Sequence, residues 1–145
     1  MNNSTDLGIF VLRITLGVAF VAHALLKLLV FTLPGTAQFF GSLGLPPFLG
    51  YVVFAAELIG GILLVAGIGS RYVAVALVPI MLGALWAHSG NGWVFSGNGG
   101  GWEYPLFWTA ALVAQVLLGD GAYALGAKLS GRSGAPRLQR ALRMK

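Results

Sequence analysis

The sequence predicts an all-α fold, a bundle of four transmembrane helices. Two features of the composition support this: 57% of the residues are hydrophobic and only 9% are charged, with a mean hydropathy of +0.84. A soluble domain usually has about 25% charged residues. The third observation is that the apolar residues gather in four segments without the strict alternation of a membrane β-strand. A single membrane domain therefore accounts for most of the 145 residues.

Four apolar segments are the candidate spans. The first two run from Leu7 to about Phe31 and from about Leu49 to Ile68, and both provide the roughly 20 residues that a helix needs to cross about 30 Å of hydrocarbon. The last two run from Tyr72 to about Ala87 and from about Tyr104 to Leu118. Because these two are shorter, we expect them to recruit residues from their flanking loops.

The segments between the predicted spans contain residues that end helices. Residues 32–47 (TLPGTAQFFGSLGLPP) are rich in proline and glycine, which excludes one continuous helix there. The run GIGSR at 67–71 predicts a tight turn, and hence an antiparallel hairpin of the second and third spans. Residues 88–105 form a second long loop rich in glycine, and its Pro105 suits the first turn of the fourth helix. The run GDG at 119–121 is expected to end that helix.

The distribution of lysine and arginine predicts the orientation. Neither long loop contains either residue, whereas Arg71 lies in the short turn and six basic residues follow Gly121. Basic residues are retained on the cytoplasmic side. We therefore expect a multi-pass membrane protein with cytoplasmic termini, made of a membrane domain (1–126) and a basic cytoplasmic tail (127–145). The tail is expected to contact the lipid bilayer surface, and no nucleic-acid partner is expected.

Three ionisable residues lie at similar depth inside the predicted spans. His23 and Lys27 are one helical turn apart on the first span, and Glu57 lies on the second. A charge near the middle of the bilayer costs about 2.5–3.5 kcal/mol, so we expect Glu57 to pair with Lys27 or with His23. Pairing with Lys27 would keep Glu57 ionised, whereas pairing with His23 would give a hydrogen-bonded couple able to exchange a proton.

Small residues accompany these polar positions. Gly17 and Ala24 lie on the same face of the first span as Lys27, and Gly60 follows Glu57 by three residues. Small residues allow neighbouring helices to approach closely. We therefore expect Gly60 to lie at a contact between helices.

Several of the polar residues also have a purely structural explanation. Lys27 alone could extend along its own stem to the membrane surface. Arg13 and Arg71 could be ordinary anchors at the cytoplasmic boundary. His88 and Glu103 could be solvated ends of the second long loop. Glu57 is the hardest residue to explain in this way, because its side chain is too deep and too short to reach water.

The sequence excludes several classes of redox centre. The absence of cysteine removes disulfides, thiolate metal sites and c-type haem attachment. The chain has no nucleotide-binding motif and no haem or iron–sulfur ligand set. His23 and His88, together with a carboxylate, would be able to bind zinc or iron, but no local ligand spacing supports this. We therefore expect no metal site.

Four stretches of the chain resemble the DoxX family of small four-helix bacterial membrane proteins. They are RITLGVAFVAHALLKL (13–28), FGSLGLPP (40–47), AELIGGILLVAGIGSRYVAVAL (56–77) and MLGALWAHSGNGW (81–93). The resemblance covers nearly all of residues 7 to about 125. By matching position, the polar signature of the family falls on Arg13, His23, Lys27, Glu57, Arg71 and His88.

The resemblance implies a protein of the bacterial inner (plasma) membrane that is a component of a quinone-linked oxidoreductase or of oxidative-stress handling. It also implies a soluble or membrane oxidoreductase as partner and a quinone-like molecule as ligand. On this hypothesis His23, Lys27 and Glu57 are the catalytic residues. His23 would donate to one quinone carbonyl and relay a proton, Lys27 would polarise the other carbonyl, and Glu57 would orient His23. We expect four further residues to contact the ligand: Arg13, Trp86, His88 and Glu103. Three tryptophans are expected to wall the outer mouth of the site: Trp86, Trp93 and Trp102.

A second hypothesis belongs to a different class of protein. The same polar face would serve a non-catalytic membrane carrier, or an assembly and scaffold protein that binds a small amphiphile or a membrane partner. The sequence alone leaves both hypotheses open.

Overall fold

The computed structural model describes residues 3–129, and within that range the protein is all-helical. The four long helices are α1 (Asn3–Leu29), α3 (Leu49–Ala66), α4 (Ser70–His88) and α5 (Glu103–Leu118). By length and composition, α1, α3 and the helical stretch Ser70–Asn91 are able to cross a membrane, whereas α5 is a shorter apolar helix of 16 residues. The predicted four-helix bundle is confirmed.

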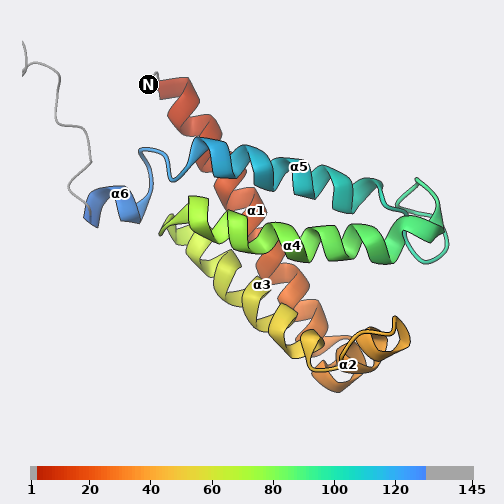
Figure 1. Ribbon diagram of the computed structural model, residues 1–145. Helices are drawn as coiled ribbons and strands as arrows, with labels where there is room; N and C mark the ends of the chain where they lie inside the picture. The colour runs from red at the N-terminus through yellow and green to blue at the C-terminus, as the bar shows by residue number, and fades with distance from the viewer. Residues whose placement is uncertain (1–2, 130–145) are drawn as a thin grey trace, which may run out of the picture.

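The long helices form two antiparallel pairs that meet at one end (Figure 1). α1 packs most extensively on α3, and α4 packs most extensively on α5. The first half of α1, the α3–α4 turn and the end of α5 lie together at what we call the Arg13 end. Away from this end the two pairs run in different directions, so that α2 (Leu33–Ser42) lies apart from the loop at 92–101. The shorter helix α5 runs back along α4.

Two facing glycines bring α1 and α3 together. A Cβ atom added to Gly17 would lie 2.7 Å from the carbonyl oxygen of Gly61, and one added to Gly61 would lie 2.8 Å from the carbonyl oxygen of Gly17. The expected contact at Gly60 has a different partner, because Gly60 faces the side chain of Leu77 on α4. The adjacent glycines of α3 therefore serve two different neighbouring helices.

The core is formed by apolar side chains from all four long helices. Its buried members are Leu16, Phe20, Leu64, Ala74, Leu77, Met81, Trp108 and Leu112. The outward faces carry large exposed apolar side chains, among them Ile59, Tyr72, Phe107 and Leu117. Such a surface would promote aggregation in water, but it suits contact with lipid. Burial thus agrees with the assignment of the chain as a membrane protein.

The two connections at the ends of α3 differ in how well the sequence predicted them. The tight turn at GIGSR is present, with Gly67 and Gly69 both in the left-handed region at φ 70° and 60°. The loop expected at 32–47 contains the helix α2, which the sequence analysis did not predict. Pro34 lies in the first turn of α2, and the Thr32 side chain accepts a hydrogen bond from the backbone N–H of Gly35. Proline is tolerated in a first turn, so its presence there does not exclude a helix.

The last described element lies at the predicted domain boundary. The short helix α6 (Leu125–Leu129) spans the boundary expected between residues 126 and 127. The remainder of the predicted basic tail, residues 130–145, lies outside the described residues. The division into a domain and a tail therefore stays a prediction.

Candidate functional site around His23 and the Lys27–Glu57 pair

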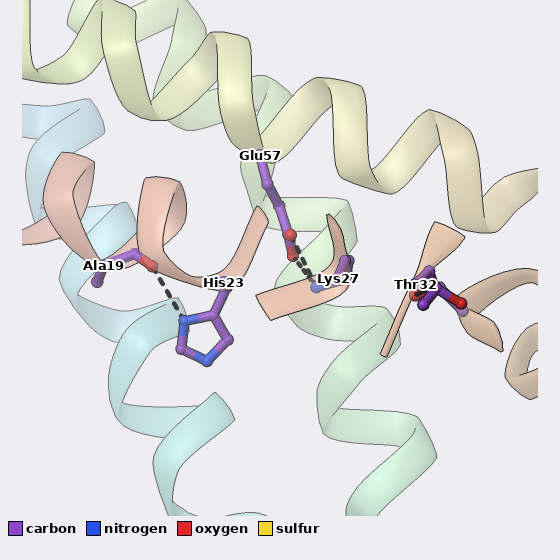
Figure 2. Close-up of polar contacts among 6 residues, drawn as sticks. Ala19, His23, Lys27, Thr32 and Glu57 are labelled. Carbon is purple, nitrogen blue, oxygen red and sulfur yellow. Dashed lines mark hydrogen bonds and ion pairs between the residues drawn. The ribbon is translucent and has the colours of Figure 1, made fainter. Parts of the chain in front are cut away.

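A buried ion pair joins α1 to α3. The Nζ atom of Lys27 donates to both carboxylate oxygens of Glu57, at 3.0 Å to Oε1 and 2.7 Å to Oε2 (Figure 2). Only 7% of the Glu57 side chain and 17% of the Lys27 side chain is exposed. Of the two partners that the sequence left open for Glu57, Lys27 is the one that binds it. Lys27 does not extend along its own stem to the surface but bends towards the carboxylate.

His23 is held by its own helix and not by Glu57. Its Nδ1 atom lies 3.0 Å from the carbonyl oxygen of Ala19, one turn earlier in α1. Figure 2 shows the ring directed away from Glu57 and Lys27. Among the described residues 3–129, no hydrogen bond joins Glu57 to His23, so the expected role of Glu57 in orienting His23 stays a prediction. A histidine inside a helix can donate to the backbone carbonyl four residues earlier, and this local bond needs no second helix.

Aromatic side chains of α5 surround the His23 ring. The ring of Trp108 meets it edge-on, with 4.7 Å between the ring centroids, and the ring of Tyr104 is stacked on it, with 6.3 Å between the centroids. Phe20 of α1 also contacts Trp108, and Phe95 contacts Tyr104. The distances between the ring centroids are 4.7 Å and 5.4 Å. His23 therefore lies at the contact between α1 and α5, in an aromatic cluster that we define as Phe20, His23, Phe95, Tyr104 and Trp108.

The sequence analysis did not identify Tyr104 and Trp108 as site residues. A usable signal was present, since the two aromatics lie four residues apart in an apolar segment and so share one face of its helix. Of the three tryptophans that were expected to wall the site, Trp93 lines the apolar groove that Tyr104 also lines. Trp86 is 56% exposed, and Trp93 and Trp102 pack on each other at 4.5 Å in the loop between α4 and α5.

His88 fastens the glycine-rich loop to the end of α4. Its Nδ1 atom lies 3.0 Å from the carbonyl oxygens of both Gly99 and Gly100, and the Asn91 side-chain amide donates to the same two oxygens. Glu103 lies at the other end of this loop, where its backbone N–H donates to Trp93. The Glu103 side chain lines a shallow apolar groove on α5 that Tyr104 also lines. Through Tyr104, this groove adjoins the aromatic cluster.

Arg13 lies at the opposite end of the bundle from His88. Only 1% of the residue is exposed, and its guanidinium donates to the carbonyl oxygens of Leu64 and Val65, both at 2.7 Å, and of Tyr123 at 3.1 Å. The Val65 carbonyl lies in the last turn of α3, where carbonyl groups have no partner inside the helix, and the Leu64 carbonyl also accepts from the backbone N–H of Gly67. Ten residues separate Arg13 from His23, or about 15 Å along a helix. The structure therefore does not bring Arg13 into the aromatic cluster.

Two further polar residues complete the Arg13 end. The carboxylate of Asp120 accepts a hydrogen bond from the backbone N–H of Ser70, the first residue of α4. The exposed Arg71 donates to the carbonyl oxygen of Leu117, at 3.3 Å. Both contacts connect the α3–α4 turn to the end of α5, which closes the bundle at this end.

The described residues contain no group of three or more His, Cys, Asp or Glu side chains able to hold a metal ion. His23 and His88 each bond to backbone carbonyls, as described above. The two histidines thus belong to separate hydrogen-bonding arrangements.

Comparison with known proteins agrees with this architecture. The chain is 44% identical over 85 residues to "Putative oxidoreductase CatD" from Bacillus subtilis (strain 168). That match covers 59% of this chain and 62% of the relative, so it spans less than two thirds of the relative's length. No solved structure matches the chain. The model of the DoxX family matches residues 8–90, which include α1 to α4 with His23, Lys27 and Glu57, and the chain is therefore a member of the DoxX family of membrane proteins.

Proposed function

We propose that this chain is the membrane component of a quinone-linked oxidoreductase. The observation that carries the proposal is the position of His23, a proton-exchanging side chain held inside an aromatic cluster one helical turn from the buried Lys27–Glu57 pair. The name of the Bacillus relative, "Putative oxidoreductase CatD", supports the same class of reaction. A bound quinone would supply two-electron chemistry coupled to protons. The chain has no nucleotide-binding motif, so a partner protein would supply or accept the electrons.

The side chains around His23 have the chemistry that would hold a quinone ring. Tyr104 and Phe95 offer aromatic faces against which a flat ring can stack, at an energy of about 0.5–1.5 kcal/mol for each contact. His23 would hold or move a proton at Nε2. The neighbouring apolar groove on α5, lined by Leu106 and Phe107, would accommodate an isoprenoid tail.

The buried ion pair has a different task in this proposal. Lys27 uses two of its three N–H bonds on Glu57, so the pair fixes α1 against α3 next to the site and leaves one donor for a ligand carbonyl. Because the paired charges largely compensate each other, they lie at this depth at a lower cost than either charge alone.

The proposed cellular setting is the bacterial plasma membrane, with both termini in the cytoplasm. The N-terminal half of α1, the α3–α4 turn and the end of α5 lie at the Arg13 end, and Arg13 and Arg71 are both there. The two connections at the other ends, 32–48 and 89–102, contain no lysine or arginine. This asymmetry supports a cytoplasmic Arg13 end.

One observation favours the non-catalytic carrier or assembly protein instead. Glu57 and Lys27 pair their charges and hydrogen-bond to each other, as expected of an ion pair with a purely structural role. In that case the pair would stabilise the bundle, and the aromatic cluster would be a docking surface for an amphiphile.

The two proposals are separated by measuring bound quinone and stability in the same samples. We would extract the purified protein with organic solvent and assay quinone, for the wild type and for His23→Ala, Glu57→Gln and Arg71→Gln. The oxidoreductase proposal expects loss of bound quinone in His23→Ala at nearly unchanged thermal stability, and retention in Arg71→Gln. If Glu57→Gln lowers stability while the folded fraction binds and turns over quinone normally, the pair has a purely structural role. If the wild type contains no quinone and binds none that is added, the oxidoreductase proposal fails.

A further inference from the structure

The hydrogen bond of His23 decides which ring nitrogen is available to a ligand. The carbonyl oxygen of Ala19 can only accept, so the nitrogen that faces it, Nδ1, carries the proton. In a neutral imidazole the other nitrogen, Nε2, then has a lone pair and no proton. Figure 2 shows this second nitrogen directed away from Lys27 and Glu57. No hydrogen bond to Nε2 occurs among the described residues 3–129, so an acceptor remains within the aromatic cluster.

A second polar atom in the same cluster lacks a partner. The indole N–H of Trp108 is buried and has no acceptor among the described residues, and the Trp108 ring contacts the His23 ring at 4.7 Å. A buried donor without a partner is destabilising, because it has lost its hydrogen bond to water. The cluster therefore offers one acceptor, His23 Nε2, and one donor, Trp108 Nε1–H.

The chemistry of these two atoms distinguishes the two redox forms of a quinone ligand. A quinone carbonyl oxygen only accepts, so it places its lone pairs against the lone pair of His23 Nε2. A hydroxyl group both donates and accepts, so it can donate a hydrogen bond to His23 Nε2. The tautomer of His23 thus reverses the role expected from the sequence, in which His23 donates to a carbonyl.

We propose that the His23 site binds an aromatic ring in its hydroxyl-bearing form, a hydroquinone or related phenol, in preference to the quinone form. This inference rests on the proposed function, since it concerns the same site and the same class of ligand. It assigns His23 Nε2 as the acceptor of a hydrogen bond from the ligand hydroxyl. The ligand-free protein should therefore bind the reduced ring more tightly than the oxidised ring.

The test compares three probes of nearly equal shape. Tetramethylhydroquinone donates hydrogen bonds, its dimethyl ether cannot, and tetramethyl-p-benzoquinone has carbonyls in the same positions. Binding would be measured without oxygen by calorimetry, with the full chain in lipid nanodiscs and empty nanodiscs as the blank, at about pH 8, where histidine is ordinarily neutral. One hydrogen bond predicts about 3- to 10-fold tighter binding of the hydroquinone than of either other probe.

Variants assign the preference to the correct residue. His23→Phe keeps an aromatic ring for stacking but removes both nitrogens, so the three probes should then bind within about twofold of one another. Arg71→Gln, at the other end of the bundle, should keep the wild-type preference. Nitrogen-15 NMR of histidine in the unmodified wild type gives an independent readout, and we expect a proton on Nδ1 and none on Nε2 of His23.

Each other outcome has a defined meaning. Equal or tighter binding of the quinone, or a proton on Nε2, overturns the inference while the proposed function stands. Persistence of the hydroquinone preference in folded His23→Phe also overturns it. If none of the probes binds above the empty nanodiscs, the proposed function itself fails.

Discussion

Gly17 of α1 and Gly61 of α3 face each other at a distance that leaves no room for a side chain on either helix. A Cβ atom on Gly61 would lie 2.8 Å from the carbonyl oxygen of Gly17 and 2.9 Å from the backbone nitrogen of Val21. Both atoms belong to the backbone of α1 and cannot move without moving the helix. This contact sets the separation of α1 and α3, and so the distance across which Lys27 reaches Glu57.

We predict that Gly61→Ala destabilises the bundle, whereas Gly60→Ala does so much less. In Gly61→Ala the two helices must separate, which should cost about 1–3 kcal/mol. In Gly60→Ala the nearest atoms are the terminal carbons of the Leu77 side chain, at 3.0 and 3.1 Å, and these can rotate. Thermal unfolding in detergent would measure both variants. Equal losses of stability would contradict the glycine contact.

The buried ion pair predicts strongly non-additive mutations. Lys27→Met and Glu57→Gln should each cost about 3–5 kcal/mol, because each leaves one charge buried without its partner. The double variant Lys27→Met, Glu57→Gln carries neither charge and should recover much of that loss. A double-mutant cycle of unfolding free energies measures the coupling. Single effects that simply add would show that the two side chains do not interact in the folded protein.

Arg13 and Arg71 should differ in their contribution to stability although both lie at the same end. Arg13→Gln removes donors from the carbonyl oxygens of Leu64, Val65 and Tyr123, and a buried group left without a partner costs about 1–3 kcal/mol. The exposed Arg71 makes one long bond, so Arg71→Gln should change stability by no more than about 0.5 kcal/mol. Thermal denaturation of the two variants in one detergent compares them directly. A larger effect for Arg71 would mean that the Arg13 bonds are not the ones that close the bundle.

The orientation predicts which introduced cysteines react on intact cells. The natural chain has no cysteine, so Ser42→Cys, at the end of α2, and Ser96→Cys, in the loop between α4 and α5, provide single labelling sites. Both should react with a membrane-impermeant thiol reagent, because they lie in connections free of lysine and arginine. A cysteine added at the C-terminus should react only after the cells are opened. The reverse pattern of labelling would place the Arg13 end outside the cell.

The sequence by itself determined the class of fold and the need of Glu57 for a partner on the first span. Four apolar segments with glycine and proline between them specify four helices, since in a bilayer every backbone N–H and C=O must be satisfied within its own segment. The same desolvation argument required a partner for Glu57, and Lys27 was one of the two partners at matching depth. The sequence did not predict helix α2. Proline occurs both in loops and in the first turn of a helix, so Pro34 alone does not distinguish the two.

Only the tertiary structure decided what surrounds His23. Periodicity places His23 and Lys27 one turn apart, but it does not say that the imidazole donates to Ala19 and turns towards α5 while Lys27 turns towards α3. That choice depends on which helix packs on each side of α1. Tyr104 and Trp108 join His23 because α5 returns along α4 to cross α1, a contact between residues about 80 positions apart that local sequence rules do not determine.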